Sequence, residues 1–142
     1  MSIVIEHLNY VYMQGGPYET KALDDVSLTI HDGEFVGLIG HTGSGKSTLV
    51  QHLNGLILPT SGKITVDGMD LADKNTDKRA IRRRVGLVFQ YPENQLFEET
   101  VAKDIAFGPK NLGLDEAEID RRVRTAMRRV ALDYDALAQR SV

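Results

Sequence analysis

The sequence predicts an α/β fold with a strand-rich first part and a helical second part. Short alternating or apolar segments suited to β-strands recur as far as Gln90. A glycine-rich loop at residues 40–48 lies between an apolar run and a helix-forming segment. No strand candidate follows Gln90. We therefore place a boundary near Tyr91, between a first part at residues 1–90 and a second part at residues 91–142.

The composition is that of a globular protein. Of the 142 residues, 42% are hydrophobic and 26% are charged. The formal net charge of −3 gives no overall reason to expect a nucleic-acid partner. Cysteine is absent, which excludes disulfides and thiolate metal sites. No apolar run approaches the ~20 residues that span a bilayer, and the N-terminus lacks a secretory signal pattern, so we expect a cytoplasmic location.

The first segments of the chain favour two strands, a loop and a buried strand. Residues 2–8, SIVIEHL, are rich in β-branched side chains and predict a strand, and residues 13–18, MQGGPY, predict a turn. Residues 22–30, ALDDVSLTI, alternate in polarity and predict a second strand, which the turn HDGE closes. Residues 34–40, EFVGLIG, are almost continuously apolar, which is typical of a strand buried on both faces.

After the glycine-rich loop the same kinds of pattern continue. Residues 46–56, KSTLVQHLNGL, predict a short helix that ends near Gly55. Residues 63–68, KITVDG, predict an alternating strand with an Asp-Gly turn. Residues 77–84, DKRAIRRR, predict a short basic helix, and residues 85–90, VGLVFQ, predict another buried strand.

Two helices are predicted in the second part. EETVAKDIAF favours a short helix with Val101, Ala102 and Ile105 facing inward. LDEAEIDRRVRTAMRRVAL favours a longer helix capped by Asp115, with Glu118 three residues further on. Its apolar residues recur at helical spacing and predict one buried face: Ile119, Val123, Ala126, Met127, Val130 and Ala131.

The glycine-rich loop has the pattern of a phosphate-binding loop, G-x-x-x-x-G-K-[ST]. Glycines allow backbone amides to converge on phosphate oxygens, and the following helix directs its positive end at the same place. Lys46 supplies a mobile positive charge, Ser47 a hydroxyl ligand for Mg²⁺, and Thr48 a donor to a nearer phosphate. The alternative, a turn with incidental glycines, is disfavoured by the predicted strand and helix on either side. The predicted nucleoside-triphosphate site comprises Gly40, His41, Thr42, Gly43, Ser44, Gly45, Lys46, Ser47 and Thr48.

Hydrolysis of the nucleotide requires a second acidic group at the end of a buried strand. Asp67 follows an alternating segment and belongs to an Asp-Gly turn, which favours an exposed strand end. Asp115 and Glu116 follow Gly113, which interrupts the apolar run, and they suit a helix cap better. We therefore expect this chain to lack the second carboxylate.

Two segments carry a resemblance to a known family. VGLVFQYPENQLF and TSGKITVDG resemble the nucleotide-binding subunit of ABC transporters. Within that family, FQYPENQLFEETVAKDIAFGPKNLG is similar to the ATPases of energy-coupling factor importers, in particular the second of their two paired ATPases. The resemblance covers essentially the whole chain. It implies a RecA-like P-loop core with an N-terminal antiparallel β-subdomain at residues 1–90, ending at the Q-loop, and the start of a helical subdomain at residues 91–142.

The resemblance also implies roles for individual residues. Lys46 and Gln90 would be catalytic, with Lys46 on the outer phosphates of ATP and Gln90 as the Q-loop glutamine. Ser47 and Gln90 would contact Mg²⁺. Tyr12 would stack on adenine, although Tyr10 and Tyr18 are close in the sequence and ordinary strand packing is an alternative for a tyrosine. The family's signature motif, its Asp-Glu strand and its switch histidine do not occur in this chain, so the fold is expected to be truncated.

The implied partners are proteins of an importer for vitamins or for transition-metal ions such as cobalt or nickel. They are a second ABC ATPase subunit, a transmembrane coupling protein and a substrate-binding membrane protein, with this chain peripheral on the cytoplasmic face of the membrane. No nucleic-acid partner is expected. In this family, strands that lie between the phosphate-loop strand and VGLVF come from the C-terminal half, so we expect apolar segments with exposed edges, an aggregation risk.

Several alternatives remain open at this stage. The chain could belong to a soluble P-loop enzyme such as a kinase or a DNA-maintenance ATPase, or could bind nucleotide without turning it over. KRAIRRR and RRVRTAMRR could contact nucleic acid, but solvated helix faces explain them better. Glu93, Glu98, Glu99 and Asp104 could form an acidic docking surface or simply a solvated helix start. The four histidines have no metal-ligand spacing.

Overall fold

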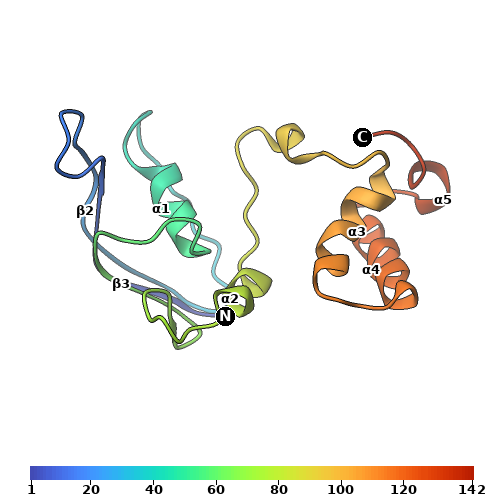
Figure 1. Cartoon of the computed structure of the whole chain (residues 1–142), viewed down its shortest axis with the longest axis horizontal. Coiled ribbons are helices and arrows are strands. Elements are labelled where there is room, and N and C mark those ends of the chain that lie inside the picture. Colours follow the sequence, from blue (N-terminus) through green and yellow to red (C-terminus); the bar gives the residue numbers. More distant parts are fainter. The chain divides into compact units, whose positions relative to one another are not determined.

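The computed structural model describes residues 1–142. Two compact units make up the chain, Met1–Leu87 and Val88–Val142 (Figure 1), and each is described by itself. The first unit holds every β-strand and the second unit is helical. The predicted change from strands to helices along the chain is therefore confirmed.

An antiparallel sheet forms the first unit. It contains β1 (Ile3–Tyr12), β2 (Thr20–Ile30), β3 (Ser61–Val66) and the short β4 (Met69–Asp70), in the spatial order β2-β1-β3-β4. Strand β1 is central and pairs antiparallel with both β2 and β3. The β-subdomain implied by the resemblance is therefore present. Strand β4 was not predicted, because two residues carry no periodicity.

Alternation along the strands places the apolar residues of the first unit on one face of the sheet. Ile5 stands opposite Leu28 on one side and Ile64 on the other. The β1–β2 register shifts between Ile5 and Leu8, where His7 has a φ of 49°. Ile5 and Leu8 are therefore both buried although they are three positions apart, an odd spacing that would place them on opposite faces of a regular strand. The buried core of this unit comprises Ile3, Ile5, Leu8, Leu23, Leu49, Ile64, Val66, Leu71 and Ile81.

Two short helices contribute to this core. Helix α1 (Lys46–Leu53) buries Leu49, and helix α2 (Lys78–Arg84) buries Ile81. The Asp77 side chain accepts a hydrogen bond of 2.9 Å from the amide of Arg79, which caps α2 in the manner expected of an aspartate at that position. Both helices were predicted, with bounds close to those observed.

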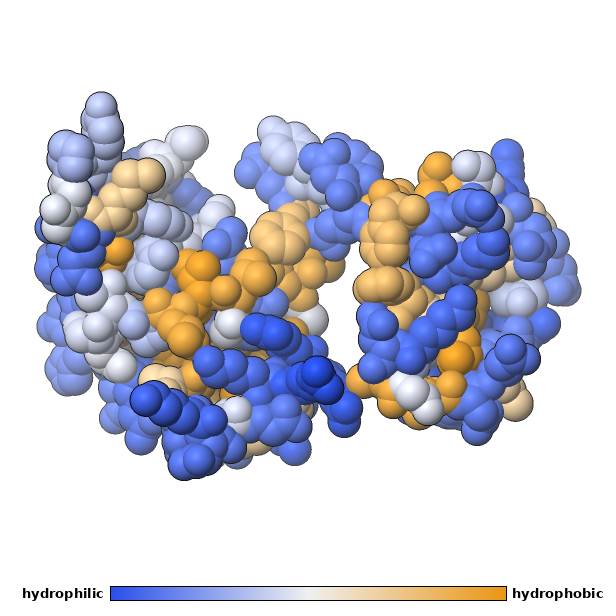
Figure 2. All heavy atoms as spheres, in the orientation of Figure 1, coloured by the Kyte–Doolittle hydropathy of each residue, from blue (hydrophilic) through white to orange (hydrophobic).

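The two apolar segments that were predicted as buried strands are not strands in this chain. Residues 34–40 and 85–89 form no ladder hydrogen bonds, and their side chains are largely exposed: relative exposure is 101% for Phe35, 98% for Ile39 and 78% for Val88. A strand buried on both faces needs a neighbouring strand on either side. No other segment of the chain pairs with residues 34–40 or 85–89. Figure 2 shows apolar residues gathered on the surface of both units.

The second unit is built from helices. After the 3₁₀ helix η1 (Pro92–Gln95), it contains α3 (Val101–Asn111), α4 (Glu116–Arg129) and α5 (Tyr134–Leu137). The side chains of Thr100, Asp115 and Asp133 accept amide hydrogen bonds at the starts of α3, α4 and α5. Each helix therefore begins at a residue whose side chain satisfies free backbone donors.

The core of the second unit is small. It comprises Ala106, Val123, Met127 and Ala138, with Val101, Ala102, Ile105 and Ile119 packed against it. The predicted inward face of α3 is therefore confirmed, as are Ile119, Val123 and Met127 on α4. The prediction was wrong for the rest of the α4 stripe, because Ala126 and Val130 are exposed and Ala131, with a φ of 57°, lies outside the helix. Helix α4 ends at Arg129, so helical spacing no longer applies to Val130 and Ala131, whereas Ala126 is within α4 but on its exposed side.

None of the helices is long and apolar enough to cross a membrane.

Candidate phosphate-binding site

The glycine-rich loop turns tightly before α1. The amide of Ser44 donates to the carbonyl of His41 at 3.2 Å, and Gly43 and Gly45 both have a φ of 83°. A Cβ on Gly45 would lie 2.5 Å from the carbonyl oxygen of Ala22, in addition to the strain of that backbone conformation. Glycine is therefore required at residue 45 for two separate reasons.

The loop leaves a set of backbone donors free. The amides of residues 45–48 donate no hydrogen bond within the chain, since the first helical bond at this end runs from the Leu49 amide to the Gly45 carbonyl at 2.8 Å. The first turn of α1 holds no acidic side chain that would neutralise the positive helix end. This geometry suits an anion with several oxygens.

The Lys46 ammonium group lies across the loop. Its Nζ donates to the carbonyl oxygens of Gly40 at 2.8 Å and His41 at 2.7 Å, and to the Ser44 hydroxyl at 3.3 Å. Its positive charge therefore lies against residues 40–44 of the loop, which come directly before the free amides in the chain.

The two hydroxyl residues that follow Lys46 differ in exposure. Ser47 is exposed, so its hydroxyl is accessible as one hard oxygen ligand for Mg²⁺, and the remaining ligands would come from phosphate and water. Thr48 is buried, and its hydroxyl lies 3.1 Å from the hydroxyl of Tyr12. The residues present therefore fit a magnesium–nucleotide complex, in which Ser47 would be a metal ligand.

The structure distinguishes the three neighbouring tyrosines. Tyr12 is at the end of β1, half-exposed, and its hydroxyl contacts α1 through Thr48. The Tyr10 ring packs against the buried ring of His52, whereas Tyr18 lies in the exposed turn after β1. Of the three, only Tyr12 combines an exposed surface with a contact to the phosphate-loop helix. Its role in stacking on adenine stays a prediction.

An apolar hollow of about 240 Å³ lies beside the loop. Its walls are formed by Leu23, Val26, Leu38, Ile39 and Leu49 together with the loop residues Gly40, Ser44, Gly45 and Lys46. The exposed segment 34–40 borders this hollow, so the apolar surface continues from the hollow onto that segment.

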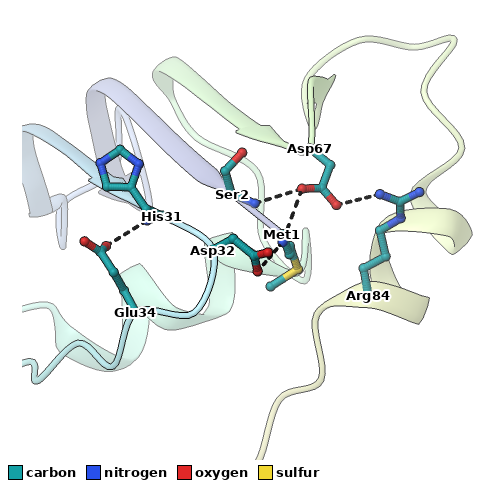
Figure 3. Close-up of polar contacts among 7 residues, drawn as sticks. All are labelled: Met1, Ser2, His31, Asp32, Glu34, Asp67 and Arg84. Atoms are coloured by element: carbon teal, nitrogen blue, oxygen red, sulfur yellow. Dashed lines mark hydrogen bonds and ion pairs between the residues drawn. The ribbon is translucent and has the colours of Figure 1, made fainter.

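Asp67, one of the acidic residues considered for hydrolysis, has other partners. The carboxylate of Asp67 accepts from the Ser2 amide at 2.8 Å and from Arg84 at 2.5 Å, and these hydrogen bonds, with Ser2 the larger influence, lower its pKa (Figure 3). The Met1 amine pairs with Asp32 at 2.6 Å and also lies 4.0 Å from the Asp67 carboxylate. Asp67 therefore joins the chain start, the β3–β4 turn and α2.

Comparison with known proteins identifies the family. The family model described as ABC transporter matches residues 23–142. The chain belongs to the ABC transporter family.

Curated relatives and solved structures of this ABC transporter family agree with the match. The energy-coupling factor transporter ATP-binding protein EcfA2 of Clostridioides difficile is 59% identical over 141 residues, which cover 99% of this chain and 49% of the relative. The protein of the same name from Symbiobacterium thermophilum is 62% identical over 133 residues, covering 94% of this chain and 46% of that protein. The chain spans about half the length of the curated relatives it matches.

Among solved structures, CbiO1 of Clostridium perfringens, described as part of the ABC transporter complex CbiONQ, superposes with a TM-score of 0.76 at 39% identity, covering 93% of this chain and 51% of that chain. The ATP-binding cassette MJ0796, solved as a dimer bound to ADP and Pi, superposes with a TM-score of 0.79 at 25% identity, covering 98% of this chain and 61% of that chain. The predicted fold class, a P-loop ABC ATPase core, is confirmed.

Gln90 lies in the second unit of this ABC transporter family member. The phosphate-loop residues and Tyr12, in contrast, all lie in the first unit. Gln90 is exposed, in the bend before η1. Its catalytic and metal-binding roles stay predictions.

The acidic residues that follow Gln90 are not equivalent. The Asp104 carboxylate accepts from the amides of Phe97 and Glu98, at 3.2 and 3.3 Å, so it closes the loop before α3. Glu99 pairs with Lys103 at 2.5 Å, and this contact lowers the pKa of Glu99. Sequence patterns did not indicate these contacts. Since Asp104 and Glu99 are engaged within the chain, Glu93 and Glu98 are the acidic residues of this group that are available to a partner.

Three of the five arginines of α4 have partners on their own helix. Arg121 and Arg122 each donate to Glu118 at 2.7 Å, and Arg124 donates to Asp120 at 2.7 Å. These pairs have the i,i+3 and i,i+4 spacing of a solvated helix face, as the sequence favoured. Asp115 caps the helix through the Glu118 amide at 2.9 Å, but the Glu118 side chain pairs with the arginines and does not return to the cap.

Proposed function

We propose that this chain is the nucleotide-binding part of the ATPase subunit of an energy-coupling factor importer. The observation that carries the proposal is the loop at residues 40–48, with free amides at residues 45–48 and Lys46 beside them. Relatives over 50% identical across nearly the whole chain are named as ATP-binding proteins of energy-coupling factor transporters, which supports the type of importer. The cargo, a vitamin or a transition-metal ion, is carried over from the resemblance alone.

In this proposal the ligand is ATP with Mg²⁺. The free amides and Lys46 bind the outer phosphates, Ser47 supplies a metal ligand, and Thr48 donates to a nearer phosphate. Mg²⁺, when bound, neutralises part of the phosphate charge. Tyr12 stacks on adenine. The resemblance implies that Gln90 would serve as a ligand of the metal or orient the attacking water.

The described residues are proposed to bind nucleotide without hydrolysing it by themselves. Hydrolysis needs a carboxylate beside the metal. Asp67 is held by Ser2 and Arg84, and Asp115 caps α4. Neither acid is therefore free to contribute to the phosphate loop.

The partners follow from the proposed importer. A second ABC ATPase subunit forms the nucleotide sandwich, which the dimeric cassette structure supports. A transmembrane coupling protein contacts the second unit, with Gln90, Glu93 and Glu98 on the surface that it approaches, and a further membrane protein recognises the cargo. The ATPase is then peripheral on the cytoplasmic face of the membrane, with residues 1–90 in its core and residues 91–142 starting its helical subdomain.

Calorimetric titration of the full chain with MgATP tests the proposal. We expect saturable binding that Lys46→Ala abolishes while the fold, followed by circular dichroism, stays unchanged. Absence of binding to the folded wild-type chain would contradict the nucleotide-binding role. Steady phosphate release by the pure 142-residue chain, lost in Lys46→Ala, would contradict the statement that these residues bind without hydrolysis.

A further inference from the structure

Four residues of the first unit, Tyr10, Tyr12, Thr48 and His52, form a closed set of contacts between β1 and α1. The hydroxyls of Tyr12 and Thr48 lie 3.1 Å apart, and the Thr48 carbonyl lies 2.7 Å from Nδ1 of His52. The His52 ring packs edge-on against Tyr10, with ring centroids 4.8 Å apart, and Tyr10 packs edge-on against Tyr12 at 4.7 Å. The set therefore joins the residue predicted to stack on adenine to the helix that carries the phosphate loop.

Sequence spacing brings these residues together. Tyr10 and Tyr12 are two residues apart on β1, so both project from the same face of the strand. Thr48 and His52 are four residues apart on α1, so they lie one turn apart on the same side of the helix. The tyrosine pair of β1 contacts the Thr48–His52 pair of α1 where the strand and the helix meet. The edge-on packing of the aromatic rings is a favourable arrangement.

His52 is the least ordinary member of the set. Its relative exposure is 0%, and because a carbonyl can only accept, the proton of the neutral ring is on Nδ1 and points to Thr48. Nε2 is buried without a hydrogen bond. Burial lowers the pKa of His52, so the ring stays neutral at pH 7.

If residue 52 only filled space between β1 and α1, the two ring nitrogens of histidine would serve no purpose there. Burying a nitrogen such as Nε2 without a hydrogen-bond partner is unfavourable, and a leucine at this position would avoid that cost. What the histidine supplies is an Nδ1–H donor to the Thr48 carbonyl, one turn earlier in the same helix, together with a flat ring edge for Tyr10. These two contacts point in different directions, one along the helix and one to the strand.

We propose that His52 is a positioning residue that fixes Tyr12 relative to Thr48 and the phosphate loop. The inference rests on the proposed nucleotide binding and deepens it. Most of the proposed phosphate contacts come from the loop amides and from Lys46, whose ammonium group has no contact with His52. Loss of His52 therefore loosens the adenine end of the site and leaves the phosphate end intact. A purely structural role would weaken both ends equally.

The test compares two ligands that differ in the base. The full chain is titrated with MgATP and with magnesium tripolyphosphate, which has the phosphate chain and no adenine. His52→Leu keeps the apolar volume and removes the donor, whereas His52→Asn keeps an N–H donor near the position of Nδ1. Tyr10→Leu removes the ring contact on the strand side and tests the same set of contacts without altering α1.

In His52→Leu and in Tyr10→Leu we expect ATP affinity to fall about fivefold, the effect of one hydrogen bond or aromatic contact, with tripolyphosphate affinity unchanged. His52→Asn restores most of the ATP affinity. Equal losses for both ligands, or unchanged ATP affinity in a folded His52→Leu chain, overturn the role of His52 alone. A wild-type chain that binds neither ligand overturns the nucleotide-binding proposal and this inference with it.

Discussion

Arg84 on α2 donates a hydrogen bond of 2.5 Å to the carboxylate of Asp67 in the β3–β4 turn (Figure 3). The same carboxylate accepts from the Ser2 amide at 2.8 Å. Segments that are far apart in the sequence are therefore held at one end of the sheet by a single side chain.

The first prediction concerns the charge of Asp67. Asp67→Asn keeps the shape and tolerates the φ of 46° at this position, so it isolates the effect of the charge. Because the folded pKa of Asp67 is lowered, its stabilising effect is present above its unfolded pKa of 3.8 and is lost as pH falls through the folded value. We expect a lower urea midpoint for the variant at pH 7 and a smaller difference from wild type at pH 3. Glu6→Gln, at an exposed position on β1, is the matched control; a pH-independent difference would contradict the prediction.

The second prediction concerns Gly45. Gly45→Ala forces a Cβ to 2.5 Å from the Ala22 carbonyl at a φ of 83°. We expect a loss of at least about 1 kcal/mol in the free energy of unfolding, the usual cost of a left-handed non-glycine residue, and loss of MgATP binding. Gly86→Ala is the control, because nothing lies within 4 Å of its Cβ and its φ is ordinary. If Gly45→Ala and Gly86→Ala had the same melting temperature and the same affinity for MgATP, the positive φ of Gly45 and its close approach to Ala22 would be contradicted.

The third prediction concerns the exposed segment 34–40. Phe35 has no packing contacts to lose at a relative exposure of 101%, so Phe35→Ser should leave the urea midpoint of the chain unchanged. Light scattering should fall, because an exposed apolar side chain is removed. Ile5→Ala, at a buried position, should cost about 2–5 kcal/mol. If Phe35→Ser destabilised the chain as much as Ile5→Ala, Phe35 would have to be buried in solution.

The fourth prediction concerns Glu118 on α4. Hydrogen bonds from Arg121 and then Arg122 lower its pKa from 4.5 to about 2. The stabilisation that Glu118 provides is therefore complete above pH 4.5 and is lost as pH falls towards 2. Carboxylate chemical shifts in an NMR titration should give a depressed value in wild type and a value nearer 4.5 in the Arg121→Gln, Arg122→Gln double variant. An unperturbed titration in the wild-type chain would contradict the pairing.

Local patterns in the sequence were sufficient for most elements. The helix starting at Lys46, the Asp115 cap and the inward face of α3 depend on residues close in the chain, and all were predicted. The glycine pattern likewise identified the loop, because its backbone requirements are local.

The errors come from interactions that local patterns do not contain. Residues 34–40 and 85–89 have the composition of buried strands, but a strand also needs neighbours to pair with, and none of the described residues provides them. The contact between Tyr12 and Thr48 joins residues far apart in the sequence, and so does the pairing of Asp67 with Ser2. Asp104 was grouped with other acids by charge, although its hydrogen bonds to Phe97 and Glu98 serve the backbone.

The three oxygen partners of the Lys46 ammonium group affect which anions the loop can select. An incoming ligand must offer Nζ an interaction at least as favourable as those of two carbonyls and a hydroxyl. Chloride or a lone bicarbonate brings a single charge and few oxygens, whereas a polyphosphate presents many oxygens to Lys46 and the free amides at once. The loop's own hydrogen bonds would therefore favour a ligand with several charged oxygens over a small anion of single charge.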